Sequence, residues 1–178
     1  IIGTCDADNT EVCIVNRTVF EKVADSMNGS DIIAIVDKPG YTLDYVMRTV
    51  DECDNIVVLD RLQDPGNIGT IIRTSVAAGY KAVLAVKGTA DVFSLKVLRA
   101  TAGMIFDVPV IYLDTTEELL EAVRQLGKRI CVTVPVNGVP YYSVDMKKGV
   151  ALVIGNEGNG VSDEILAGAD ELITIPMA

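Results

Sequence analysis

The chain has 178 residues and a formal net charge of -10, with 15 basic and 25 acidic side chains. A hydrophobic content of 49% predicts a packed core and excludes a largely disordered chain. The acidic total argues against generic nucleic-acid binding, because phosphate contacts need clustered cations. The sequence contains no histidine, which excludes catalytic triads, general bases and metal sites built on imidazole.

The charge is uneven along the chain. Residues 61–100 hold 6 basic and 2 acidic side chains, whereas residues 1–60 and 101–178 are both strongly acidic. Judged by charge alone, chance variation over 40 residues is the simpler interpretation. A local site for an anionic ligand is the alternative, and it depends on which motifs lie in that stretch.

The four cysteines show no CxxC spacing, so no zinc or other metal site is expected. They are typical of the reduced thiols of a cytoplasmic protein. No run of about 18 apolar residues is present, which predicts that no segment spans a membrane.

The first 40 residues form a separate small unit in this interpretation. Apolar residues at helical spacing predict a helix over Arg17–Met27. The β-branched run Asp31–Val36 ends in a turn or linker signal at residues 37–40, and a short helix is expected over Leu43–Glu52.

From Asn55 onward, buried-type strands alternate with amphipathic helices. Strands are expected at Ile56–Leu59, Ala82–Val86, Val108–Tyr112, Ile130–Val134, Val150–Ile154 and Leu172–Ile175. Helices are expected at Ile68–Ala78, Phe93–Ala102, Thr115–Gly127 and Ser162–Ala167. The alternation predicts an α/β fold, in which helices cover both faces of a parallel sheet.

One candidate site follows the first of these strands, where ligands bind in open α/β sheets. Pro65 and Gly66 predict a tight turn, and Asn67 is the expected N-cap of the next helix, whose free N–H groups suit an anion. Arg73 lies off the apolar face of that helix. Taken singly, Asn67 is an ordinary cap and Arg73 an ordinary solvated arginine; their joint placement favours a functional role.

A second candidate site is the loop Ile154–Val161, which follows a strand and contains three glycines. Their spacing differs from the dinucleotide-binding GxGxxG motif. Glycines let a backbone approach a ligand closely. The only acid of the loop is Glu157, which either marks the entry of a helix or orients a partner such as Arg73.

Four segments in this order resemble the motifs of the SpoU (TrmH-like) RNA 2'-O-ribose methyltransferases, of the SPOUT superfamily. They are Asp64–Gly69 with Arg73, Lys96–Gly103, Gly155–Gly158 and Ile175–Met177. The resemblance covers residues 55–178 and makes 41–54 a linker. More weakly, residues 1–40 resemble the end of the small L30e-like substrate-binding domain that precedes the catalytic domain in many members.

The resemblance implies a deep trefoil knot, S-adenosylmethionine as the methyl donor, and a homodimer. By family analogy, the substrate is ribosomal RNA more than transfer RNA. The resemblance assigns catalytic roles to Asn67, Arg73 and Glu157. It also implies cofactor contacts at Gly155, Ile175, Thr133 and Met177, and RNA contacts at Lys96 and Arg99.

For the mechanism, the lack of histidine directs attention to Arg73. A guanidinium is normally always protonated, so Arg73 is expected to position and stabilise the 2'-oxygen electrostatically. Asn67 would orient Arg73 or the ribose, and Glu157 would hold Arg73 through a charge-assisted pair.

The chain departs from the family at its end. Members continue after Ile-Pro-Met with a segment that opens a last helix, whereas this sequence stops at Ala178. We expect that helix to be omitted from the sequence rather than missing from the protein.

Two alternatives to a methyltransferase remain. They are a non-catalytic RNA-binding relative with a degenerate knot, and a doubly wound nucleotide- or phosphate-binding enzyme unrelated to RNA.

Overall fold

The computed structural model describes residues 12–24 and 31–177, which fall into two compact units, Ile1–Asp37 and Lys38–Ala178. The described part of the first unit contains the helix α2, Arg17–Val23, which begins where the Asn16 side chain accepts a hydrogen bond from the Val19 N–H. The predicted helix end at Met27 lies outside the described residues. The run Asp31–Val36 has no regular secondary structure.

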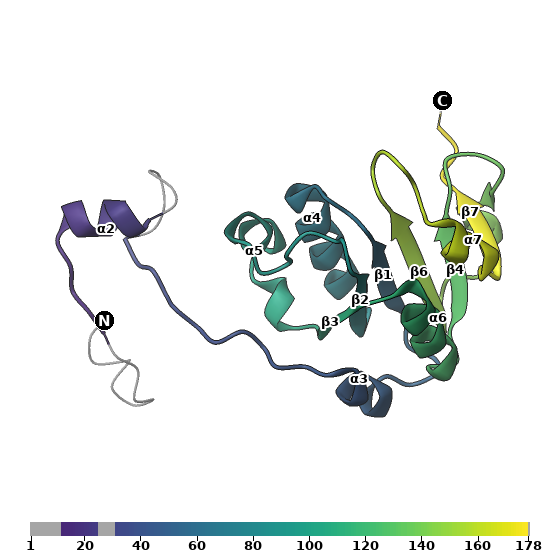
Figure 1. Ribbon diagram of the computed structural model, residues 1–178, viewed down its shortest axis with the longest axis horizontal. Coiled ribbons are helices and arrows are strands. Elements are labelled where there is room, and N and C mark those ends of the chain that lie inside the picture. The colour runs from purple at the N-terminus through teal and green to yellow at the C-terminus, as the bar shows by residue number, and fades with distance from the viewer. Residues whose placement is uncertain (1–11, 25–30, 178) are drawn as a thin grey trace. The chain divides into compact units, whose positions relative to one another are not determined.

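The second unit is built on a parallel sheet of seven strands (Figure 1). The strands are β1 Ile56–Asp60, β2 Ala82–Val86, β3 Val110–Leu113, β4 Arg129–Thr133, β5 Val139–Pro140, β6 Val150–Gly155 and β7 Glu171–Thr174. Their order is β3-β2-β1-β6-β4-β7-β5. The six predicted strands are all present. The short β5 was not predicted; it ends in a proline, which lacks an N–H, and lies at the sheet edge where that loss is tolerated.

The predicted helices are present and are mostly shorter than expected, but the helix at Pro65–Ala77 begins three residues earlier than the predicted Ile68. They are α3 Leu43–Thr49, α4 Pro65–Ala77, α5 Leu95–Thr101, α6 Thr116–Gln125 and α7 Asp163–Ala167, with 3-10 turns η2 Met104–Phe106 and η3 Tyr141–Ser143. The α5 helix ends before Ala102, which has a left-handed backbone with φ of 51°. Thr115 caps α6 as expected, since its hydroxyl accepts from the Glu118 N–H at 3.1 Å. None of the helices described is long and apolar enough to cross a membrane.

The buried apolar residues form two large cores, one on each face of the sheet, and a smaller cluster of Cys131, Val150 and Ile173. Alternate side chains of β1 point to opposite faces: Ile56 and Val58 pack with α3, α6 and α7, whereas Val57 and Leu59 pack with α4 and α5. Every residue of β1 and β2 is buried. This burial confirms the predicted α/β sheet with helices on both faces, and Figure 1 shows α4 and α5 together on one side of it.

Gly69 lets α4 lie unusually close to α5. A Cβ atom built on Gly69 would lie 2.3 Å from the Ala100 Cβ and 3.0 Å from the Val97 carbonyl oxygen. Neither contact can be relieved by turning a side chain, because both involve atoms fixed to the α5 backbone. The position of α4, which carries Asn67 and Arg73, therefore depends on a residue without a side chain at position 69.

Gly69→Ala is expected to destabilise the protein. Overpacking typically costs ~1–3 kcal/mol, and here it must exceed the roughly 1 kcal/mol that alanine gains in a helix. We expect a net loss of up to about 2 kcal/mol in the free energy of unfolding, measured by urea denaturation. Gly40→Ala is the control, since a Cβ there would meet nothing within 4 Å. Equal stability of the two variants would contradict this role of Gly69.

Candidate functional site

The candidate site lies where the chain leaves β1 and β6. These neighbouring strands are in register, with Asp60 opposite Gly155. The connection after β1 leads to α4 on one face, and the connection after β6 leads to α7, whose Ile165 packs on the other face. Strands whose connections leave to opposite faces create a crevice at their carboxyl ends, which is the usual ligand site of open α/β sheets.

The α4 helix begins at Asp64, so the expectation that Asn67 is its N-cap was wrong. The Asp64 carboxylate accepts from the Asn67 N–H at 2.8 Å, and Pro65 occupies the first turn, where its missing N–H costs nothing. Asn67 lies three residues further on and is exposed. Because Asp64 performs the capping, the side-chain amide of Asn67 is available for other contacts.

Glu157 joins the two loops of the site. Its carboxylate accepts hydrogen bonds from the Asn67 side-chain amide at 3.1 Å and from the Gln63 and Asp64 N–H groups at 3.2 Å each. Desolvation alone would raise the pKa of Glu157, but these bonds, together with one from its own backbone N–H, outweigh it and lower the pKa. Glu157 is therefore held as a carboxylate beside the start of α4.

Arg73 lies on the exposed side of α4 and forms no pair with Glu157. The ion pairs among the described residues do not include these two side chains, and the Glu157 carboxylate is instead occupied by donors from residues 63–67. The expected charge-assisted Glu157–Arg73 pair is thus absent from this structure. The placement of Arg73 off the apolar face of the helix is confirmed, since Ile68 and Ile72 are the buried residues there.

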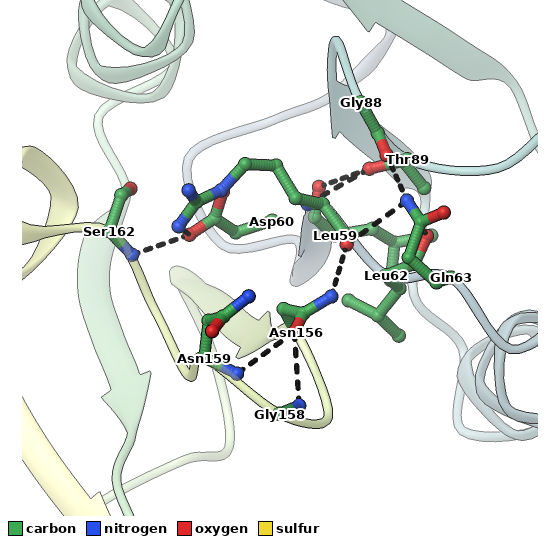
Figure 2. Close-up of polar contacts among 11 residues, drawn as sticks. Leu59, Asp60, Leu62, Gln63, Gly88, Thr89, Asn156, Gly158, Asn159 and Ser162 are labelled. Atoms are coloured by element: carbon green, nitrogen blue, oxygen red, sulfur yellow. Dashed lines mark hydrogen bonds and ion pairs between the residues drawn. The ribbon is translucent and has the colours of Figure 1, made fainter.

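Asn156 and Asp60 add further ties between the same loops (Figure 2). The Asn156 side-chain amide donates to the Arg61 carbonyl at 2.8 Å, and its oxygen accepts from the Gly158 and Asn159 N–H groups. The fully buried Asp60 accepts from the Ser162 N–H at 2.6 Å. The loop that carries Glu157 is therefore fixed to the end of β1 at two points, Asn156 before Glu157 and Ser162 after it.

The residues expected to contact the cofactor lie at the carboxyl ends of three neighbouring strands. Thr133 ends β4, Gly155 ends β6 and Ile175 follows β7, and these strands are neighbours in the order β6-β4-β7. The Thr133 hydroxyl donates to the Val153 carbonyl at 2.8 Å. A Cβ on Gly155 would lie 2.5 Å from the Val161 N, and Ile175 and Met177 are exposed. Backbone groups at the strand ends and exposed apolar side chains are therefore both accessible to a ligand at this end of the sheet.

The residues expected to contact RNA lie on α5. Lys96 and Arg99 are both exposed there, and α5 packs directly against α4. Two other cations of the positive stretch, Arg61 and Lys87, are instead engaged by Asp60 and Asp114.

A cavity of about 370 Å³ lies beside α6 and α7, apart from Asn67, Arg73 and Glu157. Its charged lining residues are Arg61, Lys87, Asp114, Glu117 and Glu164. Acids outnumber bases there, and both bases already have an acidic partner, so the cavity does not suit an anion. Within residues 12–24 and 31–177, no group of three or more Cys, Asp or Glu side chains could hold a metal ion.

Several contributors to the site were not identified from the sequence. They are Asp60, Gln63, Thr89 and Asn156, with Asp64 in the capping role. The Asp-Pro pair at 64–65 is a recognisable helix start and could have revealed the cap. The other contacts join residues up to 102 positions apart, and no local pattern predicts them.

Comparisons with known proteins show which proteins this chain is similar to. The chain is 31% identical over 164 residues to the 23S rRNA (guanosine(2553)-2'-O)-methyltransferase RlmP of Bacillus subtilis, covering 92% of this chain and 63% of that protein. It resembles the crystal structure of an rRNA methyltransferase from Sinorhizobium meliloti, with a TM-score of 0.89 and 33% identity over 99% of this chain and 68% of that one. The AdoMet-bound structure from the same organism gives a TM-score of 0.88 at 34% identity, over 99% of this chain and 67% of that one.

The chain spans about six tenths of the length of the first curated relatives, 63% and 61%. The sequence profile of the SpoU rRNA Methylase family matches residues 54–178, which include every strand of the sheet and all the site residues described above. On this match and on the similarity of the fold, the chain belongs to the SpoU rRNA methylase family.

Proposed function

We propose that residues 55–178 are the catalytic domain of an S-adenosylmethionine-dependent RNA 2'-O-ribose methyltransferase. The observation that carries the proposal is the contact of the Glu157 carboxylate with Asn67 and with the Gln63 and Asp64 N–H groups. This contact brings two distant motifs together at the carboxyl ends of β1 and β6, on the helix that also carries Arg73.

In this proposal, the chain supplies positioning and electrostatic stabilisation. When bound, S-adenosylmethionine supplies an activated methyl group. The ribose 2'-oxygen forms a bond to the methyl carbon as the carbon–sulfur bond breaks, S-adenosylhomocysteine leaves, and the hydroxyl proton passes to solvent water. Arg73 stabilises the negative charge that develops on the oxygen, which a permanently charged guanidinium does without acting as a base. Asn67 orients the ribose, and Glu157 fixes Asn67 and the first turn of α4. Correct placement of the reacting groups contributes much of the rate.

The cofactor would occupy the edge formed by the ends of β6, β4 and β7. Thr133, Gly155, Ile175 and Met177 lie there, and exposed apolar side chains beside strand-end backbone suit an adenosine. A trefoil knot at this edge is consistent with the strand order, since β6 lies between the earlier strands β1 and β4, and β7 between β4 and β5.

We further propose that the protein is a cytoplasmic homodimer that acts on ribosomal RNA. An rRNA substrate is favoured by the relatives from Bacillus subtilis and Sinorhizobium meliloti, whose names specify rRNA. Lys96 and Arg99 would contact the RNA backbone. Apolar residues are exposed beside the β5 edge, which a second copy would cover: Val136, Val139, Tyr141 and Tyr142. Residues 1–40 would end a small L30e-like substrate-binding domain.

Arg73→Ala should lower the methyl-transfer rate by about 10²–10³-fold, the usual effect of removing one oxyanion donor. The measurement is transfer of a labelled methyl group from S-adenosylmethionine to ribosomal RNA by the full-length protein. Arg48→Ala is the matched control, because Arg48 is also an exposed helix arginine but pairs with Asp44 on α3. Near-normal turnover by a folded, donor-binding Arg73→Ala variant would rule out this role.

Glu157→Gln should remove a pH-dependent contribution to stability. Because folding lowers the pKa of Glu157, its stabilisation is complete above the ordinary glutamate pKa of about 4.3 and is lost as the pH falls through the folded value. Urea unfolding of wild type and variant between about pH 3 and 7 should therefore give a difference that shrinks towards the acid end. A difference independent of pH would contradict the contacts assigned to this carboxylate.

Calorimetry with S-adenosylmethionine distinguishes the proposed enzyme from a non-catalytic RNA-binding relative. We expect the full-length protein to bind the donor, and S-adenosylhomocysteine to compete for the same site. If a folded protein binds RNA but neither compound, the non-catalytic alternative is correct.

A further inference from the structure

The residue that follows β1 adopts a backbone conformation that side chains disfavour. Arg61 has a φ of +57°, in the left-handed region. Outside glycine, such residues persist where surrounding contacts hold them, and they cluster at functional sites. Arg61 turns the chain from the buried strand β1 into the loop that precedes α4, so its conformation sets the direction of that loop.

Polar contacts hold Arg61 from several directions. Its N–H donates to the Thr89 hydroxyl at 3.1 Å, and its carbonyl accepts from the Asn156 amide at 2.8 Å. Its guanidinium donates to the buried Asp60 carboxylate at 2.9 Å. Thr89 comes from the connection after β2, so the turn is held by a third loop besides the two that form the candidate site.

Thr89 is well placed to lock this turn. Its side chain is buried, with 8% of the residue exposed, and its hydroxyl both accepts from the Arg61 N–H and donates to the Leu59 carbonyl at 3.1 Å. One hydroxyl thus bonds both the Leu59 carbonyl, inside β1, and the Arg61 N–H, directly after β1. The Gln63 side chain donates to the Gly88 carbonyl, which ties the same connection to the loop a second time.

The turn determines where Glu157 can bind. Two and three residues after Arg61, the Gln63 and Asp64 N–H groups point to the Glu157 carboxylate. If Arg61 relaxed to the right-handed or extended region, the peptide groups that follow it would rotate, and those two donors would no longer face Glu157. Glu157 would then lose two of its bonds, and its contact with Asn67 would lose support.

We propose that Thr89 is a positioning residue for the methyl-transfer site: its hydroxyl locks the left-handed turn at Arg61, which aims the Gln63 and Asp64 N–H groups at Glu157. This inference rests on the proposed function for its effect on catalysis. Thr89 itself contacts neither Asn67 nor Glu157 and acts only through the turn.

The test uses Thr89→Val and Thr89→Ser in the full-length protein. Valine keeps the shape and removes the hydroxyl, whereas serine keeps the hydroxyl. We expect Thr89→Val to raise the pKa of Glu157 towards its ordinary value, measured by NMR of carboxyl-labelled glutamate and assigned with Glu157→Gln. Its kcat should fall tenfold to about a hundredfold with little change in the KM for RNA. Thr89→Ser should restore both values.

Thr101→Val is the matched control. Thr101 is fully buried, and its hydroxyl donates to the Leu98 carbonyl at 2.8 Å within α5, away from the turn. This variant also loses one buried hydroxyl and should lower thermal stability without changing the pKa of Glu157. If Thr89→Val behaves like Thr101→Val, with reduced stability but unchanged pKa and kcat, Thr89 only stabilises the fold and the proposal is wrong.

Adding Arg61→Gly tests the turn itself and remains informative if Thr89→Val fails to fold. Glycine adopts positive φ without strain, but this change also removes the guanidinium bonded to the buried Asp60, so Arg61→Gly alone is the reference. The double variant should match Arg61→Gly in the pKa of Glu157 and in kcat. A further loss caused by Thr89→Val in the glycine background would overturn the proposal. If wild type transfers no methyl group to RNA, the proposed function is wrong, and the pKa measurements alone decide whether Thr89 positions Glu157.

Discussion

The parallel pairing of β1 with β6 is the constraint on which the rest of the structure depends. The register places Asp60 opposite Gly155, so the loops that follow begin side by side although about 95 residues separate them in the chain. Both strands lie deep in the sheet, where alternate side chains enter two separate cores. Sliding one strand by a residue would turn every buried side chain to the wrong face, so the register is strongly determined.

The polar contacts at the carboxyl edge build on this register. Asp60, Asn156 and Glu157 each join the end of β1, or the loop after it, to the loop after β6. The Asp60 contact is buried, so leaving it unmade would be costly, whereas the Glu157 contacts are exposed and mainly orient the two loops. A rigid frame of this kind can present Asn67 and Arg73 at fixed positions, which catalysis by positioning requires.

The charge pattern has a clearer meaning in the fold than in the composition. The positive stretch 61–100 is divided: Arg61 and Lys87 form ion pairs with Asp60 and Asp114, while Lys96 and Arg99 are exposed on α5. Arg73 and these two α5 residues lie on helices that pack against each other. In the proposed function, these residues give a strongly acidic protein a small basic surface for RNA, where long-range attraction is weaker and local fit matters more.

The sequence by itself determined the α/β class, six of the seven strands, the helices between them and the family resemblance. The fold class and its elements follow from local patterns: β-branched runs, helical spacing of apolar residues, and glycines at strand ends. The family resemblance rests instead on four motifs and their order in the chain. The Asp64 cap was within reach of the same reasoning, because the Asp-Pro pair is local. Only the tertiary structure decided that Glu157 binds Asn67 rather than Arg73, and that Thr89 holds the turn at Arg61. These contacts depend on the strand order and on the backbone direction after β1. Both arise from packing between segments distant in sequence, so no local sequence pattern predicts them.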